Sequence, residues 1–227
     1  MTTLLNIETA TDICSICISR DRMVLAREAT DEAFQHAAKI TLLIKQCLET
    51  AELALADIDA IAVSRGPGSY TALRIGISVA KGIAYALDKP LIAVDTLQAL
   101  AVATAAIHQK DGQYYPMIDA RRMEVYTAPF DRGGKRLADA ESRVIDEQSF
   151  QEEIEQGHDL ILSGNGAAKC KAVLPSEQII HHEVYCDSLH LVELAHRAFE
   201  QKDFVDIAYF TPFYLKPPNI TIAKKKL

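Results

Sequence analysis

The sequence has no long hydrophobic run. Its most apolar region, near residues 75–107, is bordered by Arg74 and interrupted by four charged side chains: Lys81, Asp88, Lys89 and Asp95. A membrane-spanning helix needs about 20 consecutive apolar residues, so none is expected. The first residues, MTTLLNIETATD, also lack the basic region and small-residue cleavage site of a signal peptide. These absences predict a cytoplasmic protein with no membrane contact.

Cysteine is scarce and odd in number, with five residues in a chain of 227. Without an export signal, an odd count favours reduced thiols over a disulfide framework. Cys14 and Cys17 form a C-x-x-C pair, but their segment has the pattern of a strand, where residues three apart point to opposite faces. Buried free thiols are therefore expected, and a metal shared by these two residues is not.

Positive charge is also in short supply. The net charge is −7, from 24 Lys and Arg against 31 Asp and Glu, which disfavours tight independent binding to nucleic acid. The one basic cluster, Lys224 to Lys226, leaves RNA binding through the tail as an alternative. With 49% apolar and 24% charged residues, the chain is typical of a folded protein with one large core or two small ones.

The hydrophobic pattern divides the chain into two similar halves. The segments LLNIET, ICSICIS and MVLAREA predict an antiparallel meander, followed by a helix at 31–51 and a β-α-β-α alternation. A second module starts near Tyr114, with a hairpin around Arg121 and Arg122. We therefore expect an α/β fold of duplicated lobes, comprising residues 1–108 and residues 109–227.

The loop SRGPGSY, residues 64–70, has glycines but no lysine after them. A Walker-type phosphate loop requires Lys and Ser or Thr directly after its last glycine, and the next lysine here is Lys81. The favoured interpretation is a turn made by Gly66, Pro67 and Gly68, with Ser69 as the N-cap of a helix. Anion binding by the free N–H groups of the helix start is the alternative.

The helix that begins at Ser69 is apolar over an arc of roughly 200°, which is wider than one sheet face requires. Such a helix either lies inside its own domain or meets another chain. Its small residues form a ridge that a second helix can approach closely, and the helix at 31–51 is the candidate neighbour. The expected partner surface consists of Ala72, Ile75, Gly76, Val79, Ile83 and Ala86, together with Phe34, Ala37, Ile44 and Leu48.

The stretch GPGSYTALRIGISVAKGIAYALDKPLIAVDTLQALA resembles the signature of the TsaB (YeaZ) family, bacterial proteins for threonylcarbamoyladenosine synthesis on tRNA. LLNIETATD, HAAKITLLI and DARRMEVY match the family in the same order, and SGNGA and PFYLK fit more loosely. Ala72 stands where glycine is usual, and Met123 where glycine is common. The resemblance covers most of the chain and implies an actin/Hsp70-like (ASKHA) fold of two related lobes.

The resemblance also allows a test for a metal site. The catalytic paralogue TsaD binds a metal through two His on the helix that follows the strand matching PLIAVD. Thr96 and Leu100 take those positions here, so that metal site is expected to be absent. The seven histidines are not expected to replace it: His181 and His182 are adjacent and should point apart, and His108 is isolated in the sequence.

Candidates for nucleotide contact are weaker. The turn of the first hairpin, ETATD, has no glycine, although Thr9 and Asp12 could contact an anion or magnesium. Asp119 at the matching turn of the second lobe, and Gly164 and Asn165 in a later loop, complete the set. An ATP-dependent small-molecule kinase that uses Asp119 as its base is the alternative function.

The resemblance implies a non-catalytic partner and scaffold of TsaD, with TsaE as a further component. The complex transfers threonylcarbamoyl to the adenosine beside the anticodon of tRNAs that read codons beginning with A. We expect no intrinsic cofactor, ATP and magnesium only within the complex, tRNA contact only through the complex, and a homodimer when the chain is alone.

Overall fold

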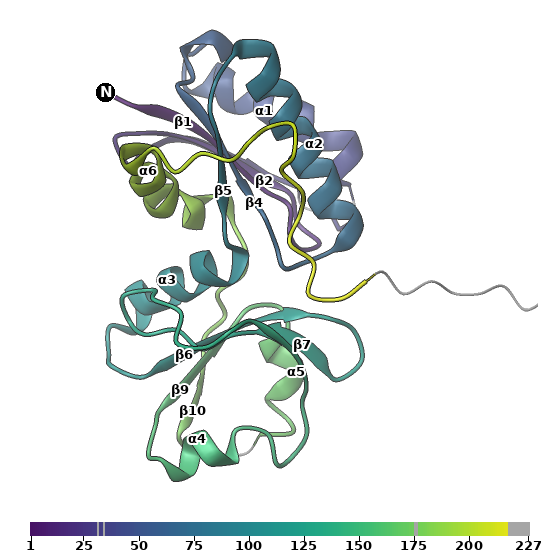
Figure 1. The fold of residues 1–227 in the computed structure, drawn as a ribbon, viewed down its shortest axis with the longest axis vertical. Helices are drawn as coiled ribbons and strands as arrows, with labels where there is room; N and C mark the ends of the chain where they lie inside the picture. The colour runs from purple at the N-terminus through teal and green to yellow at the C-terminus, as the bar shows by residue number, and fades with distance from the viewer. Residues whose placement is uncertain (31, 34, 175–176, 218–227) are drawn as a thin grey trace, which may run out of the picture.

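The computed structural model describes residues 1–30, 32–33, 35–174 and 177–217, and contains two five-stranded sheets (Figure 1). The first sheet has the order β3-β2-β1-β4-β5. Its strands are β1 (Thr3–Glu8), β2 (Ser15–Arg20), β3 (Met23–Ala29), β4 (Ala60–Ser64) and β5 (Leu91–Val94). The first three form the expected antiparallel meander, and β4 and β5 add in parallel.

The second sheet repeats this topology. Its order is β10-β9-β6-β7-β8, so an antiparallel meander of β6, β7 and β8 is again extended by two parallel strands. The strands are β6 (Gln113–Asp119), β7 (Glu124–Thr127), β8 (Glu141–Val144), β9 (Leu160–Ser163) and β10 (Ile179–His181). The repeat confirms the predicted α/β fold of two related lobes.

Helices follow the strands in both lobes. In the first lobe they are α1 (His36–Thr50), α2 (Tyr70–Leu87) and α3 (Thr96–His108), with a short 3-10 helix at Leu55–Asp57. In the second they are α4 (Gln151–Glu155), α5 (Ala167–Cys170), a 3-10 turn at Ser188–Leu191 and α6 (Val192–Gln201). Helix α1 begins at His36, and residue 31, where the sequence pattern placed the start, lies outside the described residues.

The expected boundary between residues 108 and 109 does not separate the two cores. Leu97 and Leu100 of α3 pack in the core of the second lobe with Tyr114 and Ile161. Conversely, Leu191, Leu194 and Ala195 at α6 pack on the first sheet with Leu4, Ala60 and Ile92. Each lobe therefore receives a helix from the other half of the chain, because the apolar face of α3 packs in the second lobe and that of α6 packs on the first sheet. Figure 1 shows α3 between the two sheets and α6 beside β1 and β5.

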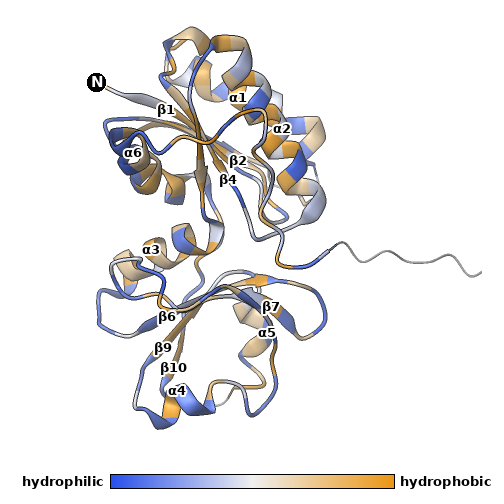
Figure 2. Cartoon of the chain, in the orientation of Figure 1, coloured by the Kyte–Doolittle hydropathy of each residue, from blue (hydrophilic) through white to orange (hydrophobic). Residues whose placement is uncertain are grey.

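Apolar side chains fill the cores of both lobes. Figure 2 shows hydrophobic colours along the strands of both sheets and hydrophilic colours on the outer side of α6. All five cysteines are buried and unpaired, as predicted. Burial raises the pKa of Cys14 and of Cys17 to about 12, which keeps both thiols protonated at neutral pH. Among the described helices, none is both long and apolar enough to cross a membrane.

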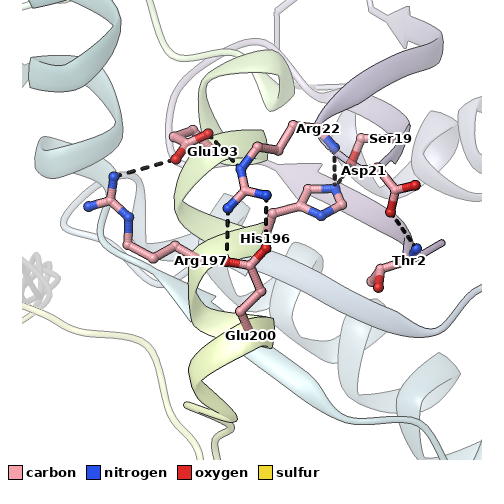
Figure 3. A network of polar contacts seen from close by, with 8 residues as sticks. All are labelled: Thr2, Ser19, Asp21, Arg22, Glu193, His196, Arg197 and Glu200. Carbon is pink, nitrogen blue, oxygen red and sulfur yellow. Dashed lines mark hydrogen bonds and ion pairs between the residues drawn. The ribbon is translucent and has the colours of Figure 1, made fainter.

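A polar network fixes α6 to the turn between β2 and β3 (Figure 3). The guanidinium of Arg22 binds both carboxylate oxygens of Glu200, at 2.8 and 2.9 Å, and also contacts Glu193. Behind this exposed pair, the buried His196 accepts the backbone N–H of Arg22 at Nε2 and lies 3.0 Å from the hydroxyl of Ser19. Because a backbone N–H can only donate, Nε2 of His196 is the unprotonated nitrogen, and the ring is neutral.

We expect this contact to make the docking of α6 sensitive to acid. Burial and the neighbouring Arg22 lower the pKa of His196. The neutral His196 ring therefore contributes to stability above the ordinary histidine pKa of about 6.5. This contribution is lost as the pH falls below that value and the ring becomes protonated. His196→Gln keeps an acceptor but cannot titrate. Urea denaturation from about pH 7 to about pH 5 should show a smaller loss of unfolding free energy in this variant, and equal losses would contradict the assignment.

The segment after α6 returns along α2. Val205 bridges to Leu91 of the edge strand β5, and the ammonium of Lys81 on α2 donates to the carbonyl of Phe210 at 3.0 Å. The backbone N–H of Phe213 then donates to the carbonyl of Arg65 at 2.7 Å. The final described residues thus lie against the start of α2, and Lys216 pairs with Glu124 in the second lobe.

Candidate functional site

A shallow groove separates α1 from α2 on the outer face of the first lobe. Its volume is about 460 Å³. The lining side chains are mostly apolar or uncharged: Ala37, Ile40, Thr41, Tyr70, Thr71, Arg74, Ile75, Ser78 and Val79. An apolar groove between two exposed helices is suited to an apolar partner surface.

The structure brings together part of the predicted partner surface. Ala37, Ile75 and Val79 line the groove, and the half-buried Ile83 and Leu48 pack on the core beside it. Ala86 is exposed near the end of α2. Phe34 lies outside the described residues.

Three predicted surface residues face inward instead. Ala72, Gly76 and Ile44 are buried in the chain's own first lobe. A Cβ built on Gly76 would lie 2.1 Å from Oγ1 of Thr9. The small-residue ridge of α2 therefore allows close approach to the end of β1 rather than to a second chain, which corrects the sequence interpretation of that ridge.

Two glycines of α2 provide a test of this packing. Gly76→Ala should lower the unfolding free energy by about 1–3 kcal/mol, because the added methyl group collides with buried Thr9. Gly82→Ala is the matched control: apart from the adjoining residues and backbone of α2, no atom of the described residues lies within 4 Å of its Cβ, so the better helix propensity of alanine should stabilise the chain by about 0.5–1 kcal/mol. Denaturant titration of both variants measures the difference, and equal effects would show that Gly76 is not packed as described.

One end of the groove holds an aromatic cluster that the sequence pattern does not reveal. The rings of Tyr70 and Tyr214 stack with centroids 4.4 Å apart, and the guanidinium carbon of Arg74 lies 4.1 Å from the centre of Tyr70. Nε of Arg74 also donates to the hydroxyl of Tyr214 at 3.2 Å. Tyrosine and arginine are the residue types enriched at binding hot spots. Tyr214 comes from a distant segment, so only the tertiary structure places it here.

The loop before α2 is a turn packed against its neighbours. A Cβ on Gly68 would lie 2.3 Å from the carbonyl oxygen of Ala10, and the N–H of Ser69 donates to that same oxygen at 2.7 Å. Gly66 has φ +107°, precedes a cis Pro67, and gives its N–H to the hydroxyl of Thr96 at 3.1 Å. The N–H groups of Gly66 and Ser69 are thus already bonded within the chain. Ser69 stands at the N-cap position, but its side chain makes no capping hydrogen bond, contrary to the prediction.

Thr96 and Leu100, the positions where the resemblance implied metal ligands in the paralogue, make structural contacts. Thr96 accepts the N–H of Gly66 and donates its own N–H to the carbonyl of Gly66, at 3.1 Å each. Leu100 is buried in the second core. Asp95, which precedes them, caps α3 by accepting the N–H of Gln98 and binds both Arg65 and Arg136, at 3.1 and 2.7 Å. This region joins the lobes through side chains of both.

The candidate nucleotide residues of the first lobe differ in exposure. Asp12 is exposed, whereas Thr9 is fully buried and its hydroxyl has no hydrogen-bond partner among the described residues. Next to Thr9, Glu8 is the last residue of β1 and not part of the turn. Its carboxyl is buried, accepts the N–H of Ala10 at 2.6 Å, and bonds to the hydroxyl of Ser64. Burial raises the pKa of Glu8 to about 7.

The candidates of the second lobe are brought together. The N–H of Asp119 donates to Oδ1 of Asn165 at 3.0 Å, so the β6–β7 turn and the loop after β9 are joined. Gly164 has φ +95°, and a Cβ there would lie 2.2 Å from the carbonyl oxygen of Met117. The carboxylate of Asp119 pairs with Lys169 of α5. Asp119 is therefore charge-neutralised within the lobe.

Comparisons with known proteins agree with this fold. Residues 30–223 match the family model described as TsaD, tRNA N6-adenosine threonylcarbamoyltransferase. The tRNA threonylcarbamoyladenosine biosynthesis protein TsaB of Haemophilus influenzae is 30% identical over 223 residues, which cover 94% of this chain and 93% of that protein.

Solved structures give the same result. YeaZ from Pseudomonas aeruginosa superposes with a TM-score of 0.81 at 27% identity, over 95% of this chain and 100% of that one. Component A of the (R)-2-hydroxyglutaryl-CoA dehydratase of Acidaminococcus fermentans shares the fold alone, with a TM-score of 0.52 at 9% identity, over 89% of this chain and 100% of that one. With its two mixed sheets flanked by helices, the chain has the ASKHA fold and belongs to the TsaB (YeaZ) family of tRNA threonylcarbamoyladenosine biosynthesis proteins.

Proposed function

We propose that this chain is a non-catalytic subunit that binds TsaD through the groove between α1 and α2. The complex transfers threonylcarbamoyl to the adenosine beside the anticodon of tRNAs that read codons beginning with A. The carrying observation is the apolar groove with Ile75 and Val79 on its α2 side, open to solvent in the single chain. Membership of the TsaB family supports a role in tRNA threonylcarbamoyladenosine biosynthesis, and the resemblance implies that the partner is TsaD.

The side chains at the candidate metal and nucleotide positions favour a non-catalytic role for this chain. Thr96 and Leu100 occupy the two ligand positions of the paralogue, and neither has an imidazole to offer. Asp119, the base required by a kinase, is paired with Lys169. ATP and magnesium then act within the complex, tRNA is contacted through it in the cytoplasm, and TsaE joins as a further component.

Sedimentation velocity of the chain mixed with TsaD from the same organism tests this proposal. The expected result is a one-to-one complex, and a homodimer through the same groove when TsaD is absent. No complex at micromolar concentration would refute the partner. Tight magnesium-dependent ATP binding by the chain alone would instead favour the kinase. Salt-sensitive tRNA binding, lost on removing residues 224–227, would favour the basic tail, which lies outside the described residues.

A further inference from the structure

Two histidines that are isolated in the sequence meet in the second lobe. His108 is the last residue of α3, and His182 directly follows β10. Nδ1 of His108 lies 2.9 Å from Nε2 of His182, and the ring centroids are 5.0 Å apart at an interplanar angle of 71°. Both residues are half-buried, so solvent reaches the pair. The two residues are 74 positions apart, so no local sequence pattern indicates this contact.

The fold holds both rings in place. The backbone N–H of His182 donates to the carbonyl of Leu162 on β9 at 2.9 Å, which continues the parallel ladder. The ring of His108 packs edge-on against Tyr114, with centroids 6.1 Å apart. Since α3 is fixed by Leu97 and Leu100 in the same core, the two imidazoles are positioned before any ligand arrives.

The surroundings of His108 favour its neutral imidazole. Burial lowers the pKa of His108, and His182 and Lys110 add to this effect, while Asp159 opposes it. A hydrogen bond between two facing ring nitrogens needs one of them unprotonated. Neutral imidazole is the form that binds metal ions.

We propose that His108 and His182 together bind a divalent transition-metal ion through the two nitrogens that now face each other. With metal–nitrogen bonds of about 2.0–2.1 Å, two adjacent ligands at a right angle are about 2.9 Å apart, which is the separation present here. A small rotation of the rings turns both lone pairs toward one ion. This site is independent of the proposed function.

The protonation balance of binding is simple. The neutral pair carries two ring protons, one of them between the facing nitrogens. When the ion binds, that ring shifts to its other tautomer, so its proton moves to its outer nitrogen, where the second ring already carries its own, and no proton is released from the neutral pair. Among the described residues, no three His, Cys, Asp or Glu side chains form a metal-binding group. Water completes the coordination, and Cu²⁺ and Ni²⁺ should bind better than Mn²⁺.

Isothermal titration of the untagged chain with Ni²⁺ at about pH 8 tests the site. We expect one ion per chain, with at least tenfold weaker binding in His108→Gln and in His182→Gln. His158→Gln, which changes a histidine outside the pair, is the matched control and should bind as the wild type does. Ni²⁺ should also raise the melting temperature of the wild type and of the control only.

A measurement on the unmutated chain avoids dependence on the variants' folding. Paramagnetic Ni²⁺ should first broaden the NMR signals of His108, His182 and Tyr114. Broadening elsewhere, or equal Ni²⁺ affinity in the wild type and both pair variants, would overturn the proposal. No binding by the wild type would overturn it as well.

Discussion

Val79→Asp should abolish the complex with TsaD and the homodimer. Val79 lines the groove between α1 and α2 and is half-buried in the single chain, so a partner that fills the groove removes the side chain from water. An unpaired charge in such an interface costs roughly 3–5 kcal/mol, which corresponds to a loss of about 10²–10⁴ in affinity. Sedimentation velocity of the variant, alone and with TsaD, measures the effect.

The matched control places the same substitution on another surface. Val144 is an exposed valine on the edge strand β8 of the second lobe, with 64% of its surface accessible. Val144→Asp should leave both pairings intact. If Val79→Asp remained folded by circular dichroism and paired as strongly as Val144→Asp, the groove would not be the binding surface.

Glu8→Gln should stabilise the chain by roughly 3 kcal/mol at about pH 8. Burial raises the pKa of Glu8 from 4.5 in the unfolded chain to about 7 in the folded one. The stabilising protonated form is therefore complete below pH 4.5, and its contribution is lost as the pH rises to about 7. Glutamine mimics the protonated acid at every pH, because it can accept from Ala10 and donate to Ser64.

Denaturant titrations from about pH 5 to about pH 8 test this account. The wild type should lose unfolding free energy over that range relative to Glu8→Gln. Glu49→Gln, on the exposed surface of α1, is the control and should follow the wild type. A Glu8→Gln variant with the wild-type pH dependence would show that the carboxyl is ionised in the folded protein.

The fold was predictable where a segment was rich in residues that favour strands. Short apolar runs such as LLNIET and MVLAREA, separated by polar turn residues, predict the first meander, and the repeated order of strands and helices indicates two lobes. The strands β8 and β10 were missed because ESRV is mostly polar and IIH has only three residues. Short strands at sheet edges obtain their pairing from neighbours rather than from their own pattern.

The candidate site was predictable only in part. The periodicity of a helix shows which residues are apolar, but it does not show which of them face the chain's own sheet and which face outward. The apolar arc of α2 contains both the groove residues, such as Val79, and the inner residues, such as Gly76. Which side meets the sheet depends on Thr9, far away in the sequence. The contacts of Tyr214 with Tyr70 and of His182 with His108 also join distant segments, so the local sequence pattern does not predict them.

The exchange of α3 and α6 between the lobes makes the molecule one cooperative unit. A fragment of residues 1–108 would keep α3 but lose Tyr114 and Ile161, against which that helix packs, and it would expose the face of Leu4 and Ile92 that α6 covers. The complementary fragment would carry α6 with no sheet to cover. Two such fragments, produced together, should reassemble into the native structure, while each alone aggregates, since every missing surface is supplied by the other half.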